Sequence, residues 1–252
     1  MTEPVLHRYG ADPAQFGELS LPTDGRPLGT VVVLHGGFWG ARYDLSLGRP
    51  LAADLAARGY AAWNLEYRRS GNGGGWPATF EDVAAGIDLL ATLPVDPSRV
   101  AAVGHSAGGH LGVWAAARAG LPDGAPGARP GVAVTGVISQ GGVLGLADCA
   151  RDRLGEDAAI KLMGGGPDAL PEPYRLADPM TWLPSPANVV CLHSHADQRV
   201  PYSYSERYVA AALAAGGRAR LVETFGDHFT LIDPATPDWA VAVAALPELL
   251  AG

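Results

Sequence analysis

The chain has 252 residues, with 18 basic and 26 acidic side chains, which gives a formal net charge of −8. Binding to nucleic acid or to an anionic membrane surface depends on lysine and arginine, so this charge argues against both. The hydrophobic share of 48% and the mean hydropathy of +0.09 fit a globular protein in which no apolar run is long enough to cross a membrane. A chain of this length is expected to form a single α/β domain over residues 1–252.

The N-terminus and the cysteines indicate a reducing compartment. Residues 1–7 lack the basic start and apolar core of a signal peptide. The two cysteines, Cys149 and Cys191, are too few for a disulfide framework. We therefore expect a cytoplasmic protein. The oligomeric state stays open, with a homodimer among the options.

Short apolar runs alternate with alanine- and leucine-rich runs along the chain, a pattern typical of a mostly parallel central sheet with helices on both faces. The runs are continuously apolar, as expected of strands covered on both sides. The predicted strands are Thr30–Leu34, Ala61–Leu65, Arg99–Val103, Thr135–Ser139, Val189–His193 and Ala219–Thr224. The predicted helices are Arg49–Arg58, Phe80–Thr92, Ala107–Arg118, Tyr204–Ala215 and Pro237–Leu250.

Two stretches interrupt this alternation. Residues 70–76 form a glycine-rich loop that ends in a tryptophan, and residues 141–186 form a long insertion with three consecutive glycines and several prolines. A long excursion between strands of an α/β protein is often a lid or a pocket wall, and otherwise it decorates the surface. We expect a lid or pocket wall over 141–186.

The sequence Gly104-His105-Ser106-Ala107-Gly108 lies between a predicted strand and a predicted helix. This context turns a G-x-S-x-G match into a candidate nucleophile elbow, because the turn is so tight that larger flanking side chains would clash. The free amides and the positive end of the helix dipole then point at the serine.

A serine hydroxyl needs a base to take its proton, and the base needs a partner that orients it. Asp197 follows the strand Val189–His193, and His228 follows the last strand across a Gly-Asp turn. Their order after Ser106 is the order of the triad in α/β-hydrolases. We therefore predict a catalytic triad of Ser106, Asp197 and His228.

The strand Thr30–Leu34 runs into His35-Gly36-Gly37-Phe38-Trp39. Attack on a carbonyl creates a negatively charged oxygen, which fixed backbone amides stabilise. We expect these amides to come from Gly37, Phe38 and Ala107.

Together these motifs resemble the α/β-hydrolase superfamily, and within it the esterase/lipase branch that contains hormone-sensitive-lipase-like enzymes and kynurenine formamidases. The resemblance covers roughly residues 28–250, and the His-Gly-Gly-x-Trp form is typical of the arylformamidase group. It implies acyl transfer to water through an acyl-serine, without metal or organic cofactor, on a small-molecule ester or amide. It also implies that His35 braces the oxyanion loop.

Trp39 and Trp76 lie on loops expected at the carboxyl ends of strands, where ligands bind in open α/β sheets. Aromatic walls suit a flat apolar group, so these residues are candidates for substrate binding and favour an aryl ester or an N-formyl aryl amine.

Three alternatives stay open. A peptidase of the acyl-peptide or prolyl-oligopeptidase type would use the same triad. A non-catalytic binding protein could share the fold. Finally, His193-Ser194-His195-Ala196-Asp197 matches the H-x-H-x-D start of a metallohydrolase site, although Gln198 stands where another histidine is expected.

Overall fold

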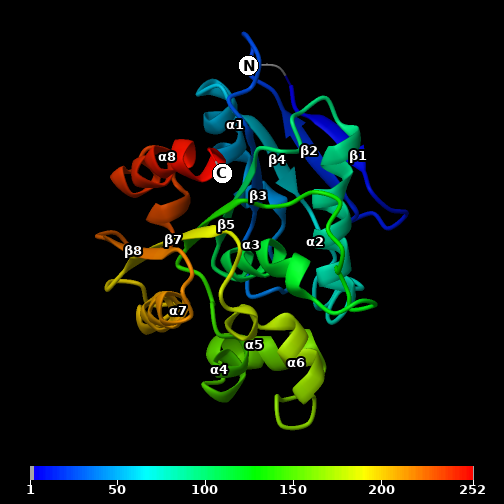
Figure 1. The fold of residues 1–252 in the computed structure, drawn as a ribbon, viewed down its shortest axis with the longest axis vertical. Coiled ribbons are helices and arrows are strands. Elements are labelled where there is room, and N and C mark those ends of the chain that lie inside the picture. Colours follow the sequence, from blue (N-terminus) through cyan, green and yellow to red (C-terminus); the bar gives the residue numbers. More distant parts are fainter. Residues whose placement is uncertain (1–2, 252) are drawn as a thin grey trace.

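A computed structural model describes residues 3–251, which contain one eight-stranded sheet (Figure 1). Its strand order is β1-β2-β4-β3-β5-β6-β7-β8. The strands are β1 (Val5–Arg8), β2 (Phe16–Ser20), β3 (Thr30–Leu34), β4 (Ala61–Leu65), β5 (Val100–His105), β6 (Gly136–Gln140), β7 (Asn188–Ser194) and β8 (Ala219–Thr224). The strands from β3 to β8 run parallel, whereas β2 is antiparallel to both β1 and β4.

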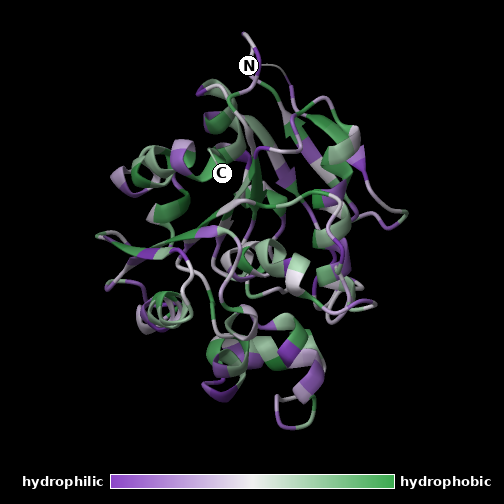
Figure 2. Ribbon diagram, viewed as in Figure 1, coloured by the Kyte–Doolittle hydropathy of each residue, from purple (hydrophilic) through white to green (hydrophobic). Residues whose placement is uncertain are grey.

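Two apolar cores lie on opposite faces of this sheet, as the alternation along β3 shows. Val31 and Val33 belong to the core under α1 (Arg49–Ala57) and α8 (Pro237–Leu250). Val32 and Leu34 belong to the other core, under α2 (Ala78–Asp88), α3 (Ala107–Ala117) and α7 (Ser203–Ala214). Figure 2 shows the hydrophobic residues gathered in the central strands. All five residues of β3 are buried, which explains the continuous apolar run.

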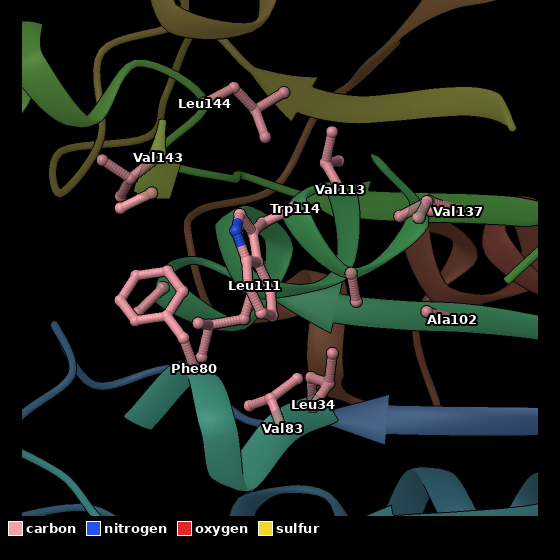
Figure 3. Close-up of a cluster of buried hydrophobic side chains, with 14 of the residues drawn as sticks. Leu34, Phe80, Val83, Ala102, Leu111, Val113, Trp114, Val137, Val143 and Leu144 are labelled. Carbon is pink, nitrogen blue, oxygen red and sulfur yellow. The ribbon is translucent and has the colours of Figure 1, made fainter. Parts of the chain in front are cut away.

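The second core packs α3 tightly onto the sheet. Figure 3 shows Leu111 and Trp114 of α3 among Leu34, Ala102 and Phe80, which come from β3, β5 and α2. Every residue of α3 is buried, so this helix is fixed on all sides. The helix that follows the candidate nucleophile is therefore a rigid support.

The predicted fold class is confirmed, and each predicted strand and helix lies within a few residues of an observed one. The sequence interpretation missed β1 and β2. The residues of β1 are mostly exposed, and β1 therefore lacks the apolar run that revealed the central strands.

Residues 141–186 form helices rather than an open loop. They comprise α4 (Leu146–Arg151), α5 (Leu154–Met163), α6 (Pro171–Ala177) and the 3₁₀ turn Pro179–Trp182, and the three α-helices lie together at the bottom of Figure 1. Backbone carbonyls of α6 accept hydrogen bonds from α3, at 3.0 Å from His110 Nε2 to Ala177 and 3.0 Å from Trp114 Nε1 to Leu176. The insertion is thus anchored to the helix that begins at Ser106.

The remaining short helices are 3₁₀ turns at Leu45–Leu47, Leu89–Thr92, Arg118–Gly120 and Thr230–Ile232. Among the helices of residues 3–251, none combines the length and apolarity needed to span a bilayer.

Candidate active site

Ser106 lies at the sharp turn from β5 into α3, with φ 54° and ψ −117°. A positive φ is unfavourable for a serine, and such strain persists only where surrounding contacts hold it. Here the Ser106 amide donates to the Gln140 carbonyl at 2.8 Å, which ties the turn to β6.

The two glycines that flank the serine are required by close backbone approach. A Cβ on Gly104 would lie 2.2 Å from the Gly108 carbonyl oxygen, and a Cβ on Gly108 would lie 2.1 Å from the Leu34 carbonyl oxygen. Both distances are far below van der Waals contact, and backbone atoms cannot rotate away. The glycines therefore let the turn close and let α3 seat against the end of β3.

The structure brings Asp197 and His228 together. Asp197 follows β7, and its Oδ2 lies 2.6 Å from Nδ1 of His228. Because an ionised carboxylate can only accept, the histidine carries its proton on Nδ1 and leaves Nε2 free to accept one. Ser106 and His228 line the same hollow.

Asp197 is held ionised. Burial acts to raise its pKa, but hydrogen bonds from His193 and His228 outweigh burial and hold the pKa well below its usual range. Its second oxygen accepts from the amides of Arg199 at 2.7 Å and Val200 at 2.9 Å. A carboxylate fixed at both oxygens can orient an imidazole and stabilise its protonated form.

Sequence reasoning did not assign His193 to the triad environment. Its Nε2 lies 3.3 Å from Asp197 Oδ2 and 3.0 Å from the Val200 carbonyl oxygen, and both of these atoms are acceptors. Nε2 therefore carries a proton, and Nδ1 can accept from the Ser205 hydroxyl at 2.7 Å. The Asp197 carboxylate thus has a second, fully buried imidazole donor.

His105 is a further residue that sequence reasoning missed, although it directly precedes the serine. Its Nε2 donates to the backbone carbonyl of His228 at 2.9 Å, and the two rings lie 4.4 Å apart. Burial, followed by the nearby His228, lowers the pKa of His105 to about 3. The hydrogen bond from His105 to the His228 carbonyl therefore ties the loop of the candidate base to the elbow.

The loop after β3 reaches the hollow with an unusual backbone. Gly37 and Phe38 have φ values of 115° and 50°, and both residues line the hollow beside Ser106. Within residues 3–251 the Phe38 amide donates no hydrogen bond to the protein, which leaves it free for a ligand. Ala107 is the first residue of α3, where amides also lack a helical acceptor.

A buried polar cluster fixes this loop from below. His35 Nδ1 donates to the Gly36 carbonyl at 2.8 Å, and the His35 ring stacks on Tyr67 at 4.4 Å. The Arg69 guanidinium pairs with Glu66, which also lies 3.2 Å from His35 Nε2. His35 therefore lies where a brace for the oxyanion loop is needed.

Neither predicted tryptophan lines this hollow, which is a correction to the expected pocket. Trp39 is fully buried and packs edge-on against His110 at 5.1 Å. Trp76 packs edge-on against Phe80 at 5.0 Å, and its amide donates to Leu162 of the insertion. Both rings therefore contribute to packing, Trp39 as a buried side chain and Trp76 as a partly buried one at the border of the core.

The hollow has a volume of about 60 Å³, well below the roughly 300–1,000 Å³ of a site for a drug-sized molecule. The residues that line it are Gly37, Phe38, Tyr43, Leu47, His105, Ser106, Arg199, His228 and Phe229. The insertion reaches this region at Gly155, where an added Cβ would lie 2.6 Å from the Phe38 ring.

The side chains of the H-x-H-x-D stretch do not converge. His193 is buried against Asp197, whereas His195 is 64% exposed and its Nε2 lies 3.8 Å from Glu223. Over the part of the chain that the structure describes, no group of three or more His, Cys, Asp or Glu side chains is arranged to hold a metal ion.

The parallel sheet, the strained serine between β5 and α3 and the buried Asp197–His228 pair define an α/β-hydrolase fold with an esterase-type site. The profile of the BD-FAE family matches residues 19–211, and the chain belongs to this family. It is thereby a carboxylic ester hydrolase. The finer resemblance to kynurenine formamidases has no counterpart among these matches.

Solved structures show the same fold. A truncated carbohydrate esterase from gut microbiota superposes with a TM-score of 0.84 at 21% identity, over 100% of this chain and 97% of that one. A bifunctional GH43-CE protein of Bacteroides eggerthii gives 0.80 at 23% identity, over 100% of this chain and 38% of that one. The thermophilic esterase Est2 of Thermogutta terrifontis gives 0.78 at 22% identity, over 98% and 91% of the two chains. No curated protein matches the sequence.

Proposed function

We propose that this protein hydrolyses esters of short-chain carboxylic acids through an acyl-enzyme on Ser106. The observation that carries the proposal is the shared hollow, where a strained serine, an oriented histidine and the Phe38 loop meet. Nucleophile, base and oxyanion donors in one small site constitute the constellation that acyl transfer requires.

The chemistry follows from the hydrogen bonds. His228 Nε2 takes the proton of Ser106 Oγ as this oxygen attacks the ester carbonyl carbon, and Asp197 stabilises the imidazolium that forms. The amides of Phe38 and Ala107, with that of Gly37, stabilise the oxyanion. The tetrahedral intermediate then expels the alcohol, which receives the proton from His228. A water molecule, deprotonated by the same histidine, attacks the acyl-serine and releases the acid.

The size of the hollow supports a short acyl group. About 60 Å³ suits an acetyl or somewhat longer chain better than a fatty acyl chain. Est2 of Thermogutta terrifontis has been solved with butyrate and with propionate bound, and another neighbour is a carbohydrate esterase. An acetylated carbohydrate is therefore one substrate class to include in a test.

An arylformamidase or a peptidase would use the same triad, and both remain separate hypotheses. Trp39 and Trp76 give no support to an aryl substrate, because Trp39 is buried, Trp76 packs against Phe80, and neither lines the hollow. Ester hydrolysis is favoured by the family to which the chain belongs. A cytoplasmic location stays a prediction.

The test compares wild type with Ser106→Ala on 4-nitrophenyl acetate, butyrate and octanoate, an acetylated sugar and N-formylkynurenine. We expect Ser106→Ala to lose at least about a thousandfold in kcat, as enzymes that lose a nucleophile do. Ser98→Ala, which removes an exposed hydroxyl before β5, is the matched control. Paraoxon, which phosphorylates Est2, should inactivate wild type with one phosphoryl group per chain. Retention of activity in Ser106→Ala would refute the serine mechanism.

A further inference from the structure

A second hollow adjoins the one that contains Ser106. It has a volume of about 210 Å³ and is lined by Gln198, Arg199, Asp227, His228 and Phe229. Three of these residues, Arg199, His228 and Phe229, also line the first hollow. The two hollows therefore share a wall at His228, and the second is the larger and more polar one.

The chemistry of ester hydrolysis assigns different halves of the substrate to the two hollows. The acyl group stays bonded to the serine, so it occupies the small hollow beside Ser106. His228 gives its proton to the departing alcohol oxygen. The hollow that His228 borders and Ser106 does not is thus the place for the alcohol.

Arg199 contributes a positive charge to the second hollow. Its backbone is fixed next to the triad, because its amide donates to Asp197 Oδ1 at 2.7 Å. Across residues 3–251, no carboxylate lies within ion-pair distance of its guanidinium, although most arginines of the chain are paired. An exposed, unpaired guanidinium beside a catalytic histidine is available to an anion.

The charges around Arg199 determine whether the second hollow can attract an anion. The net charge of −8 disfavours the approach of anions to the protein as a whole. One carboxylate, that of Asp227, lines the same hollow, but its Oδ1 accepts from the amides of Phe229 at 2.9 Å and Thr230 at 3.1 Å. Arg199 therefore supplies the fixed positive charge among the five lining residues, since His228 is neutral while it acts as a base.

We propose that the second hollow binds the alcohol half of the ester, and that Arg199 selects alcohols that carry an anion, a carboxylate or a phosphate. A guanidinium offers paired N–H donors that match either anion. Phe229, 45% exposed, offers an apolar face to the remainder of the alcohol. This inference rests on the proposed ester hydrolysis at Ser106.

The kinetic test uses three acetyl esters of matched shape. These are 3-acetoxybenzoate, 3-acetoxyphenyl phosphate and the neutral 3-acetoxybenzamide. The measured quantity is the ratio of kcat/KM for each anionic ester to that for the amide. We expect wild type to prefer at least one anion by about three- to tenfold, the range of a partly exposed ion pair. The ratio should fall to about one in Arg199→Ala and lower in Arg199→Glu.

The matched control is Arg218→Ala, which removes another exposed arginine from the turn before β8, outside both hollows. It should keep the wild-type ratios, whereas a loss of preference there as well would show that only net charge matters and would overturn the proposal. A ratio that is the same in wild type and Arg199→Ala would also overturn it. A preference for only one of the two anions would show whether the site binds a carboxylate or a phosphate.

A binding measurement separates this inference from the proposed function. Catalytically silent Ser106→Ala protein is titrated with 3-hydroxybenzoate and, separately, with 3-hydroxybenzamide, and the dissociation constants are compared by NMR. Tighter binding of the benzoate that Arg199→Ala abolishes supports the subsite even if no ester is turned over. Equal binding of both compounds refutes it even if all three esters are hydrolysed.

Discussion

The seating of α3 against β3 can be tested with one methyl group. A Cβ on Gly108 would lie 2.1 Å from the Leu34 carbonyl oxygen and 2.6 Å from that of His35. Gly112 is one turn further along the same helix, and a Cβ there would find its nearest atom, Val137 Cγ1, at 3.4 Å. Both residues are buried glycines in α3, so alanine brings the same gain in helix propensity to both.

The two substitutions should therefore have opposite effects. In Gly108→Ala, relief of the clash requires α3 to move by about an ångström from a central strand that cannot yield. Overpacking of this kind costs about 1–3 kcal/mol. At roughly 2–4 °C per kcal/mol for a chain of this size, the melting temperature should fall by about 2–12 °C. Gly112→Ala should be neutral or more stable by up to about 1 kcal/mol.

Activity should separate the two variants further. A shift of α3 moves Ser106 and the Ala107 amide relative to the Phe38 loop, and a misplacement of about 1 Å can cost roughly a hundredfold in rate. Calorimetry and hydrolysis of 4-nitrophenyl acetate measure both effects. If Gly108→Ala keeps the wild-type melting temperature and kcat, or if Gly112→Ala loses as much, the assigned role of the close approach is incorrect.

Three further predictions concern other parts of the molecule. His193→Leu removes the second donor to Asp197 and should lower kcat/KM roughly tenfold, and His193→Gln, which keeps a donor, should restore most of the loss. Burial lowers the pKa of His110 to about 4. Below pH 6.5 this imidazole therefore binds a proton in the unfolded chain, whereas in the folded chain it stays neutral down to about pH 4. Urea unfolding should therefore show that the free energy of unfolding falls as the pH is lowered from 6.5 to 4, by about 1.4 kcal/mol per pH unit from this group. His110→Gln should reduce that slope. Trp76→Ala should lower stability without changing the ratio of KM for aryl and aliphatic esters, and a selective rise for aryl esters would return Trp76 to the substrate site.

Much of the fold follows from local patterns. Buried parallel strands need continuous apolar runs, so the runs at β3 and β4 predicted both strands to the residue. The strand β1 was not predicted because an exposed edge strand does not need a continuous apolar run. The helices of the insertion were not predicted because they are short, and their stability comes from packing on α3 more than from their own periodicity.

The candidate site divides in a similar way. The G-x-S-x-G spacing and the order of Ser106, Asp197 and His228 are properties of the chain, so both could be predicted, whereas the contact of Gly108 with the Leu34 carbonyl is visible only in the structure. The direction of a side chain on a loop is set by what it can pack against. Trp39 points into the core and Trp76 packs against Phe80 at its border, and no sequence pattern predicts these directions.

The sequence by itself determined the order of strands and helices along the chain, the elbow and the identity of the acid and base candidates. Only the tertiary structure decided that His193 donates to Asp197 and that His105 holds the His228 loop. It also decided that Arg199, which has no ion-pair partner within residues 3–251, lines two hollows. The physical reason is range. Apolar periodicity and motif spacing act between neighbours in the chain, whereas the hydrogen bonds of the site join distant segments, such as His105 and His228, which are 123 residues apart.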